Sequence, residues 1–550
     1  MAGRGSVLPS VMSHSFARIQ GPSIPRSKFD RSHGHKSVFD AGYLKPYMVD
    51  EVIPGDTFNL QSQVFARLAT PVFPLMDSLH LDTFHFFVPY RLVWEHWERF
   101  IGADENDDDP PEEFEIPSIK NSAAATLTVV SGSLADHMGL PIAVIPSEDL
   151  PSALPFRAYA LIYNEWFRDQ NLQSKIDISV GDGPDAIEDI TMMVRGKRPD
   201  YFTGALPWPQ KGDAVSIPLG TSAPVIGNGE TMGFYNGSQA FGIYSESATG
   251  HAMLSTDLDN TAIGTSGTGD PVPAGAGLSF GLEPDGAYSG VIADLSSATS
   301  ATINDLRYAF AVQQILEADA RGGTRYKELL RAHFGVDVPD YRLQRPEYLG
   351  GSSQRIDIHG VPQTSSTDAT SPQGNLSAYM QAQSRSGFSK SFVEHGVIIS
   401  IVNVRGDITY QNGMERMWSR KTRYEFYWPA LAHLGEQAIY NKEIFTGAVT
   451  ATNNTVFAYQ ERWAEMRFKQ TQVTGLFRSD AAGSLDKWHL SEDFAAAPSF
   501  NSAFIVDSTE AQLDRALAVP SEPQILFDSY QRYMCARPMP MYSTPGLQRL

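Results

Sequence analysis

The chain has 550 residues and only one cysteine, Cys535. A disulfide within one chain is therefore impossible, and a metal site built on cysteine ligands is disfavoured. This cysteine usage is typical of proteins that assemble in a reducing cytoplasm. Apolar runs are also short, since none approaches the ~18 residues of a membrane span and the N-terminus has no signal-like apolar stretch. We expect a protein without membrane spans that is not exported through a secretory signal.

Charged residues are scarce as well. They make up 19% of the chain, against roughly 25% in typical soluble proteins. The net charge is −20, which excludes nucleic-acid binding through the global field and leaves it to local basic segments. Few charges, 11% aromatic residues, 45 glycines and 35 prolines favour a β-rich protein that buries much surface against its neighbours.

One long segment lacks positive charge altogether. Residues 212–306 contain no lysine or arginine, although they include ten acidic residues and sixteen glycines. Such a composition is typical of loops and turns with little core of their own. A loop-rich stretch of this length is normally functional or disordered. We interpret it as one acidic, exposed insertion on a β-barrel.

Strand patterns flank this segment on both sides. Residues 58–68 alternate between apolar and polar, which predicts a half-buried strand. A second strand is predicted at 79–88 and a third in the β-branched run 397–404. Shorter β-like runs occupy 126–130, 523–528 and 530–537.

Helices are predicted at three places. Residues 154–166 carry an apolar stripe at helical spacing, with Pro155 in the first turn. Residues 306–320 are apolar nearly all round, which predicts a buried helix that ends at Gly322-Gly323. A third helix is predicted from Thr324 to Phe334 and ends at Gly335.

Positive charge is concentrated at the two ends of the chain. Residues 1–45 carry seven Lys or Arg against two Asp, a net charge of +5, and read as an extended arm. Two interpretations stay open: binding of a polyanion through released counterions, or lacing of neighbouring copies. In the first interpretation the residues of the arm that face the DNA are Arg18, Arg26, Lys28, Arg31 and Lys36. The tail 531–550, which lacks acidic side chains, is expected to face inward as well.

Catalytic and cofactor motifs are weak. Gly277–Gly281 matches G-x-S-x-G, but turn residues follow where a nucleophile elbow needs a helix. The glycine-rich stretch 264–269 likewise precedes no helix that could bind a phosphate. The acidic run 104–115 lacks the spacing of a calcium loop and is read as a solvated surface. We predict no catalytic residue, no cofactor and no metal.

Aromatic residues gather at two further places. Tyr424–Trp428 and the pair Trp94/Trp97 are candidates for the core or for contacts between subunits. Burial in the core is the expectation for most of them, because large apolar side chains are usually inside.

Six blocks in a fixed order resemble one known family, the major capsid proteins of microviruses, and the gokushovirus branch in particular. The segment 212–306 departs from this pattern. The blocks are PSIPRSKFDRSHGHKSVFDAGYLKPYMVDEVIPGDTFNL (22–60), YNEWFRDQNLQ (163–173), ILEADARGGTRYKELLRAHFGV (315–336), RLQRPEYLGGSS (342–353), YEFYWPALAHLGEQAIYNKEIF (424–445) and RWAEMRFKQTQVTGLFRS (462–479).

The resemblance implies a mainly β protein, an eight-stranded antiparallel viral jelly roll with long loop insertions and a few short helices. It implies sixty copies in a T=1 icosahedral shell around circular single-stranded DNA, in the virion and, during assembly, in the host cytoplasm. It further implies a small basic DNA-packaging protein and a minor pilot protein as partners. The expected parts are a basic arm (1–45), a first core part (46–211), the insertion (212–306) and a second core part with the tail (307–550).

In this branch the insertions gather at the threefold axes as protrusions that meet a host receptor. The host-facing residues expected from this are Gly227, Asn228, Tyr235, Asn236, Tyr244, Asp257 and Asp259.

Two other functions remain open from the residues alone. A jelly roll also suits a secreted or spike-like carbohydrate-binding protein. A β-sandwich glycosidase needs two carboxylates roughly 5–10 Å apart, which a sequence cannot exclude. A closed particle of megadalton mass would separate the capsid protein from both.

Overall fold

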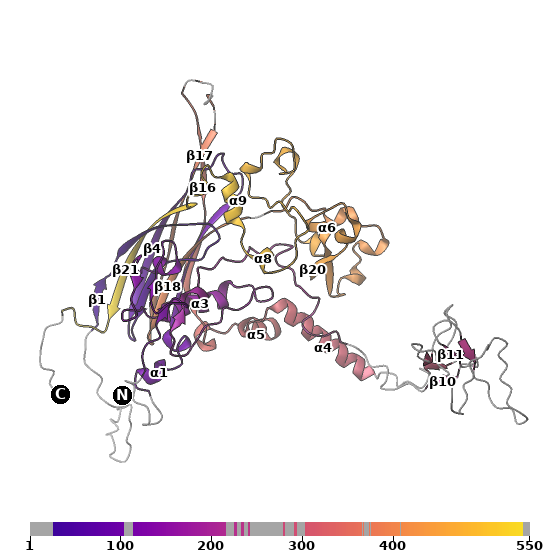
Figure 1. The fold of residues 1–550 in the computed structure, drawn as a ribbon, viewed down its shortest axis with the longest axis horizontal. Helices are drawn as coiled ribbons and strands as arrows, with labels where there is room; N and C mark the ends of the chain where they lie inside the picture. Colours follow the sequence, from indigo (N-terminus) through magenta and orange to yellow (C-terminus); the bar gives the residue numbers. More distant parts are fainter. Residues whose placement is uncertain are drawn as a thin grey trace, which may run out of the picture. The chain divides into compact units, whose positions relative to one another are not determined.

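The computed structural model describes residues 26–103, 114–215, 303–365, 367, 373–374, 376–407 and 409–542, together with five short strands between 225 and 293. The chain divides into two compact units, residues 212–316 and the remainder. Each unit is described by itself. Figure 1 shows the elements in sequence colours.

Two antiparallel sheets form the centre of the larger unit (Figure 1). One sheet has the order β1-β21-β4-β17-β16, with β2 also paired to β21, and the other has the order β15-β5-β18-β3. Eight of these ten strands form two four-stranded layers, and β1 and β2 are added at the β21 edge. The expected mainly β, antiparallel fold is confirmed. The bounds are β1 Ser27–Asp30, β2 His33–Phe39, β3 Lys45–Val52, β4 Thr57–Leu68, β5 Leu79–Pro89, β15 Glu347–Arg355, β16 Asp357–Pro362, β17 Leu376–Ser391, β18 Gly396–Gly406 and β21 Ile525–Arg537.

The main core lies between these sheets. In β4, every second side chain from Phe58 to Leu68 is buried and the ones between are exposed, so the predicted half-buried strand is confirmed. In β18 all eleven residues are buried, because helix α3 (Leu154–Ile162) covers the outer face of its sheet and contributes to a second apolar cluster. The two runs predicted near 523–537 form one continuous strand, β21.

A buried polar chain crosses between the sheets. The ring of His85 on β5 is fully buried and lies 2.7 Å from the Ser400 hydroxyl and 2.9 Å from the Ser386 hydroxyl. Ser386 belongs to β17 in the opposite sheet and also accepts from Thr83 at 3.0 Å. Burial lowers the pKa of His85 to about 3, so the ring is neutral in the fold. These bonds fix the register of one sheet against the other.

A third apolar cluster forms a lobe beside the sandwich, near β20 and α6 in Figure 1. It gathers Tyr201 and Phe202 against β19 (Glu436–Tyr440), β20 (Val456–Glu461) and α6 (Asn441–Ile444). The remaining short elements of the larger unit are η2 Tyr90–Leu92, α1 Trp97–Phe100, β6 Ile119–Lys120, β7 Leu127–Thr128, α2 Leu134–His137, β8 Val144–Ile145, η4 Tyr163–Phe167, β9 Asp185–Ala186, η5 Ile187–Asp189, η7 Asp340–Leu343, η8 Arg416–Ser419, η9 Arg423–Glu425, η10 Pro429–Leu431, α7 Thr450–Asn453, η11 Ala464–Met466, η12 Gly475–Phe477, η13 Asp486–Trp488, α8 Ser502–Ile505 and α9 Thr509–Ala516.

The helices after the insertion differ from expectation. Helix α4 (Ile303–Gly322) forms where predicted, but only Ala320 is buried among its residues. The prediction of a buried helix is therefore wrong, since side chains such as Phe310 stay exposed. Helix α5 (Tyr326–Phe334) ends as predicted at Gly335, whose φ of +67° is in the left-handed region that glycine adopts readily.

The smaller unit contains two small antiparallel sheets in its described residues. Strand β10 (Val225–Gly227) pairs with β14 (Val291–Ala293), and β11 (Gly233–Tyr235) pairs with both β12 (Ala240–Gly242) and β13 (Ser279–Phe280). Within the ranges that the structure covers, no helix has the length and apolarity of a membrane span.

A cluster of basic groups is buried beside the N-terminal strands. The Lys45 side chain is fully buried, and its Nζ lies 4.7 Å from the ring centre of Phe527. Burial lowers the pKa of Lys45 to about 7. His35 on β2 and His137 on α2 lie near Lys45. Burial is the larger cause that lowers the pKa of each ring to about 4, and repulsion by the Lys45 charge is the second. Asp136 opposes these effects.

These rings predict acid destabilisation. The unfolded histidines titrate near 6.5 and the folded ones near 4, so the unfolded state binds more protons in that window and stability falls as the pH falls through it. After discounting for the solvent that reaches His35, we expect a loss on the order of 1–2 kcal/mol. Urea unfolding of dissociated subunits at pH 6.5 and 4 measures it. The double variant His35→Gln/His137→Gln should lose this part of the pH dependence, and an unchanged slope contradicts the assignment.

Candidate functional site

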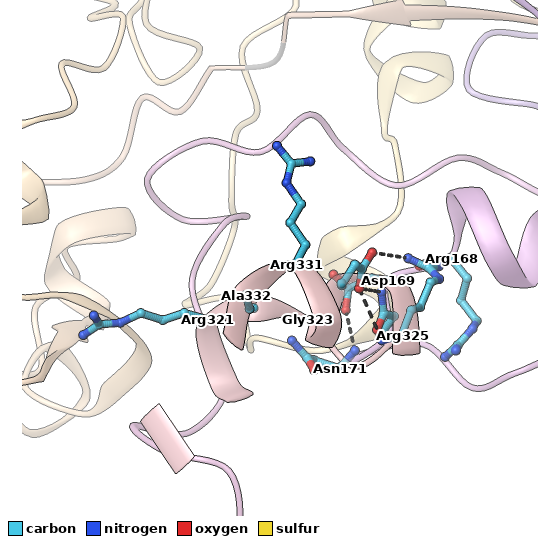
Figure 2. A pocket seen from close by; sticks show the side chains of 11 residues that line it. Arg168, Asp169, Asn171, Arg321, Gly323, Arg325, Arg331 and Ala332 are labelled. Atoms are coloured by element: carbon cyan, nitrogen blue, oxygen red, sulfur yellow. Dashed lines mark hydrogen bonds and ion pairs between the residues drawn. The ribbon is translucent and has the colours of Figure 1, made fainter. Parts of the chain in front are cut away.

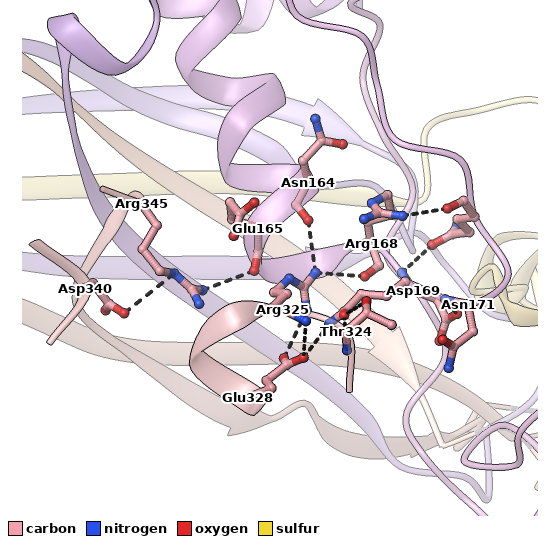
Figure 3. A network of polar contacts seen from close by, with 12 residues as sticks. Asn164, Glu165, Arg168, Asp169, Asn171, Thr324, Arg325, Glu328, Asp340 and Arg345 are labelled. Atoms are coloured by element: carbon pink, nitrogen blue, oxygen red, sulfur yellow. Dashed lines mark hydrogen bonds and ion pairs between the residues drawn. The ribbon is translucent and has the colours of Figure 1, made fainter. Parts of the chain in front are cut away.

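Three of the sequence blocks that resemble the capsid family meet at one polar junction in the larger unit. They are residues 163–173, 315–336 and 342–353, and Figure 3 shows their side chains converging below helix α3. Because these segments are more than a hundred residues apart in places, the junction depends on tertiary contacts and no sequence pattern predicted it.

Arg325, directly before α5, is the centre of the junction. Its guanidinium donates to the carbonyl oxygens of Asn164 at 2.9 Å and Arg168 at 3.0 Å, at the end of the π-helical turn η4. The Gln170 carboxamide oxygen accepts from the Thr324 backbone N–H at 2.6 Å. The residue before the N-cap of α5 is thus tied to the loop after η4, while the N–H of the N-cap residue Arg325 is bound by Glu328 within the helix itself.

A second arginine, Arg345, connects the third block (342–353) to η4. Arg345 donates to the Glu165 carbonyl at 3.1 Å, and its guanidinium carbon lies 4.3 Å from the ring centre of Trp166. The indole N–H of Trp166 donates to the Pro346 carbonyl at 3.0 Å. A planar guanidinium stacked on an indole holds both planes in a fixed orientation, so the start of β15 is anchored to η4.

A hollow of about 660 Å³ lies between α5 and the loop after η4. Four arginines line it, but they do not converge: in Figure 2 Arg321 and Arg331 extend away from Arg168 and Arg325. Arg321 forms an ion pair with Glu436 instead. The four arginines therefore do not form one anion site, and Arg325 is the one whose bonds tie the start of α5 to η4.

The predicted DNA-facing cations belong to a sheet. Of the described ones, Lys28 lies on β1 and Lys36 on β2, both paired with β21. Lys28 is exposed, and Lys36 lies 3.2 Å from the Asp528 carboxylate at an exposed site. Arg26 donates to the Ala536 carbonyl at 3.2 Å. Residues 27–39 are thus sheet edge.

Arg31 differs from the other cations. Its guanidinium binds Asp50 with two bonds, of 2.5 and 2.7 Å. A paired, part-buried fork of this kind holds strands together and is already neutralised. Arg18 lies outside the described residues.

The expected host-facing residues fall in the smaller unit. Gly227 ends β10 and Tyr235 ends β11. The other residues of that set lie outside the described residues: Asn228, Asn236, Tyr244, Asp257 and Asp259. Their role stays a prediction.

The two aromatic segments have different environments. Trp94 is fully buried, as expected for the core. Tyr424 and Phe426 are 67% and 54% exposed, and Tyr427 and Trp428 are exposed too, so the expectation of burial is wrong for this segment. With Trp418 these rings form what we call the aromatic surface.

Arginines order the aromatic surface. Arg423 lies 4.8 Å from the ring centre of Trp428, and Arg420 lies 5.8 Å from that of Phe426. Each of the five rings is at least 40% exposed, which is unusual for several large apolar side chains within eleven residues of sequence. Trp, Tyr and Arg are also the residue types that dominate binding at protein interfaces.

Known proteins similar to this chain match it nearly from end to end. Residues 17–547 match the family described as Capsid protein (F protein). The capsid protein VP1 of Bdellovibrio phage phiMH2K is 46% identical over 541 residues, covering 97% of both chains. Capsid protein VP1 of Chlamydia phage 1 is 42% identical over 602 residues, covering 100% of both. That of Spiroplasma virus 4 is 36% identical over 561 residues, covering 98% of both.

These relatives are structural proteins and not enzymes, and all come from gokushovirus-type microviruses. The family suggested by the six sequence blocks is thereby confirmed. The chain belongs to the capsid protein (F protein) family, among the major capsid proteins of the gokushovirus branch of the microviruses.

Proposed function

We propose that sixty copies of this chain close into a T=1 shell around single-stranded DNA. The observation that carries this proposal is the match to capsid proteins over nearly the whole of both chains. The shell is the virion's outer layer, and its copies are made and assembled in the host cytoplasm.

The aromatic surface supports the contact between copies. A standard interface buries about 800 Å² on each partner, and large exposed rings such as Tyr424 and Trp418 are the kind of side chain that such an interface buries at its centre. Cyclic symmetry repeats each contact around the shell, and weak contacts then add up to a stable cage. The exposed face of α4, with Tyr308 and Phe310, is a second candidate contact.

We predict that the wild-type chain elutes as a particle of megadalton mass and that Tyr424→Ser/Phe426→Ser raises the concentration needed for assembly at least tenfold. The reason is that truncating a central ring in an interface costs roughly 1–2 kcal/mol, and the loss recurs at every copy. Size-exclusion chromatography and sedimentation velocity measure it. The matched control is Tyr424→Phe, which keeps the ring and should assemble normally.

Circular dichroism of the double variant must show a folded subunit, since both rings are exposed. A wild-type chain that remains a 60.5 kDa monomer contradicts the shell and favours a carbohydrate-binding protein or a glycosidase. A folded double variant that assembles like the wild type contradicts the role of the aromatic surface.

The insertion 212–306 is proposed to be the host-attachment part, projecting at the threefold axes toward a receptor. Its support is its separate compact unit and its composition, free of lysine and arginine. An acidic, lysine-free surface resists non-specific binding to nucleic acid and keeps particles apart.

Deleting residues 220–300 should leave assembly intact and abolish attachment to host cells. The reason is that the unit to which they belong is compact by itself and the sandwich does not include it. Electron microscopy counts the shells and a cell-binding assay measures attachment. Complete loss of shells from a soluble, folded variant argues against a separable protrusion.

The partners proposed inside the shell are those that the family resemblance implies. Sixty chains of net charge −20 repel a polyanion, so cations between the two favour its enclosure. We propose that the N-terminal residues 1–45, with Arg18, Arg26, Lys28 and Lys36, and a small basic packaging protein supply them. A minor pilot protein completes the proposed virion.

A further inference from the structure

The open side of the six-stranded sheet presents an unusual set of side chains. Alternate residues of β4, β17 and β21 point away from the core, and nearly all of them are exposed, with Gln381 half-buried. We call this set the open sheet face. It consists of Asn59, Gln61, Gln63, Phe65 and Arg67 on β4, Tyr379, Gln381, Gln383, Arg385 and Ser389 on β17, and Leu526, Asp528, Tyr530, Arg532 and Met534 on β21.

The register arranges these residues in rows across the strands. Tyr530 lies opposite Gln63, which lies opposite Arg385. Two residues along the strands, Asp528 lies opposite Phe65, which lies opposite Gln383. Neighbouring strands are about 4.8 Å apart, so side chains in one row touch or nearly touch.

Three arginines surround these two rows of side chains. Arg67 stands at one end, opposite Leu526, and Arg532 at the other, opposite Gln61, with Arg385 on the side of β17. Six residues of β21 separate the two ends, which is about 20 Å at 3.3 Å per residue. All three arginines are exposed. Lys28 and Lys36 extend the positive charge along β1 and β2.

Acidic side chains on this face are fewer. Asp528 forms an ion pair with Lys36, and Asp30 binds the Ser32 hydroxyl and lies near Arg532. Asp357 stands at the outer edge on β16, opposite Gln381. Five cations against three carboxylates leave the open sheet face positive, on a chain whose net charge is −20.

We propose that the open sheet face binds single-stranded DNA. The arginines bind phosphates, the rings of Phe65, Tyr379 and Tyr530, all more than a third exposed, stack on unpaired bases, and the glutamines bind base edges without demanding one sequence. The inference rests on the proposed function and gives the enclosed genome a defined place on the chain: the sheet itself, in line with Lys28 and Lys36.

A second copy of the chain fits this face less well. A twofold contact would bring equal positive charges together, which costs free energy. Amide side chains of β4 and β17 also occupy much of the face, whereas the fully buried centre of a protein interface is more apolar. The large apolar rings available for copy-to-copy contact lie instead on the aromatic surface.

The test uses dissociated full-length subunits and a fluorescein-labelled thirty-nucleotide oligo(dT), with binding followed by fluorescence anisotropy at several salt concentrations. The variant Arg67→Gln/Arg385→Gln/Arg532→Gln should bind more weakly, and its slope of log affinity against log salt should be about 2 smaller, since each phosphate contact on a single strand contributes about 0.7. Tyr530→Ala should lower affinity roughly tenfold with little change in slope.

The matched control is Arg355→Gln, an exposed arginine on β15 in the other sheet, which should bind like the wild type. An unchanged affinity and slope in the triple variant overturns the proposal. If that variant binds DNA normally but fails to assemble, the open sheet face contacts another copy of the chain, and the proposal is overturned as well. Ultraviolet cross-linking in DNA-filled particles should attach the genome to peptides of β4 and β21, and cross-links confined to other segments also overturn it.

Binding by free subunits is independent of shell formation. Subunits that bind DNA but never close into particles contradict the T=1 shell and leave this inference standing. If the triple variant forms shells that enclose as much DNA as wild-type shells do, this inference alone is contradicted.

Discussion

The packing of two antiparallel sheets face to face is the interaction on which the rest of the molecule depends. Apolar rows from β4 and β21 meet those of β5 and β18, and each buried Å² contributes roughly 25 cal/mol. The buried hydroxyls bonded to His85 fix the register of this contact. A shift of one residue would leave several buried polar groups without hydrogen-bond partners. Long insertions between strands are tolerated because the core between the two sheets is complete without them.

The molecule built on this sandwich has surfaces of opposite character. The sandwich faces its own helices on one side and presents the open sheet face on the other. The aromatic surface lies on segment 418–428 and the junction around Arg325 holds α5. In the proposed shell, such a division keeps contacts with copies and contacts with DNA from competing for the same side chains.

Sequence patterns predicted the strands whose environment is simple. β4 has one buried and one exposed face, so its alternation is clear, and β18 is buried on both faces, so it is a continuous β-branched run. The strands β1 and β2 were missed because their alternation consists of serine, glycine, histidine and lysine beside few apolar residues. Their place in the sheet is fixed by pairing with β21, about five hundred residues away.

The candidate sites were predictable only in part. Composition identified Lys28 and Lys36 as unusual, but whether a cation is free depends on its partner: Asp50 neutralises Arg31, and no local pattern reveals that pair. The error at α4 has a related cause, because an apolar pattern indicates burial without saying whether the same chain or another one supplies the cover. The family blocks include Arg325 and Arg345, but nothing in the sequence indicated that these two residues meet η4 at one junction.

The position of β21 has a consequence for folding. This strand pairs with β4 along twelve residues and carries β1 and β2 on its other edge. Its partner residues on β4 lie more than 450 positions earlier in the sequence, so a very long loop must close before this sheet is complete. Contacts of such high sequence separation form slowly, and we therefore expect docking of β21 to be a late and slow step in the folding of the sandwich.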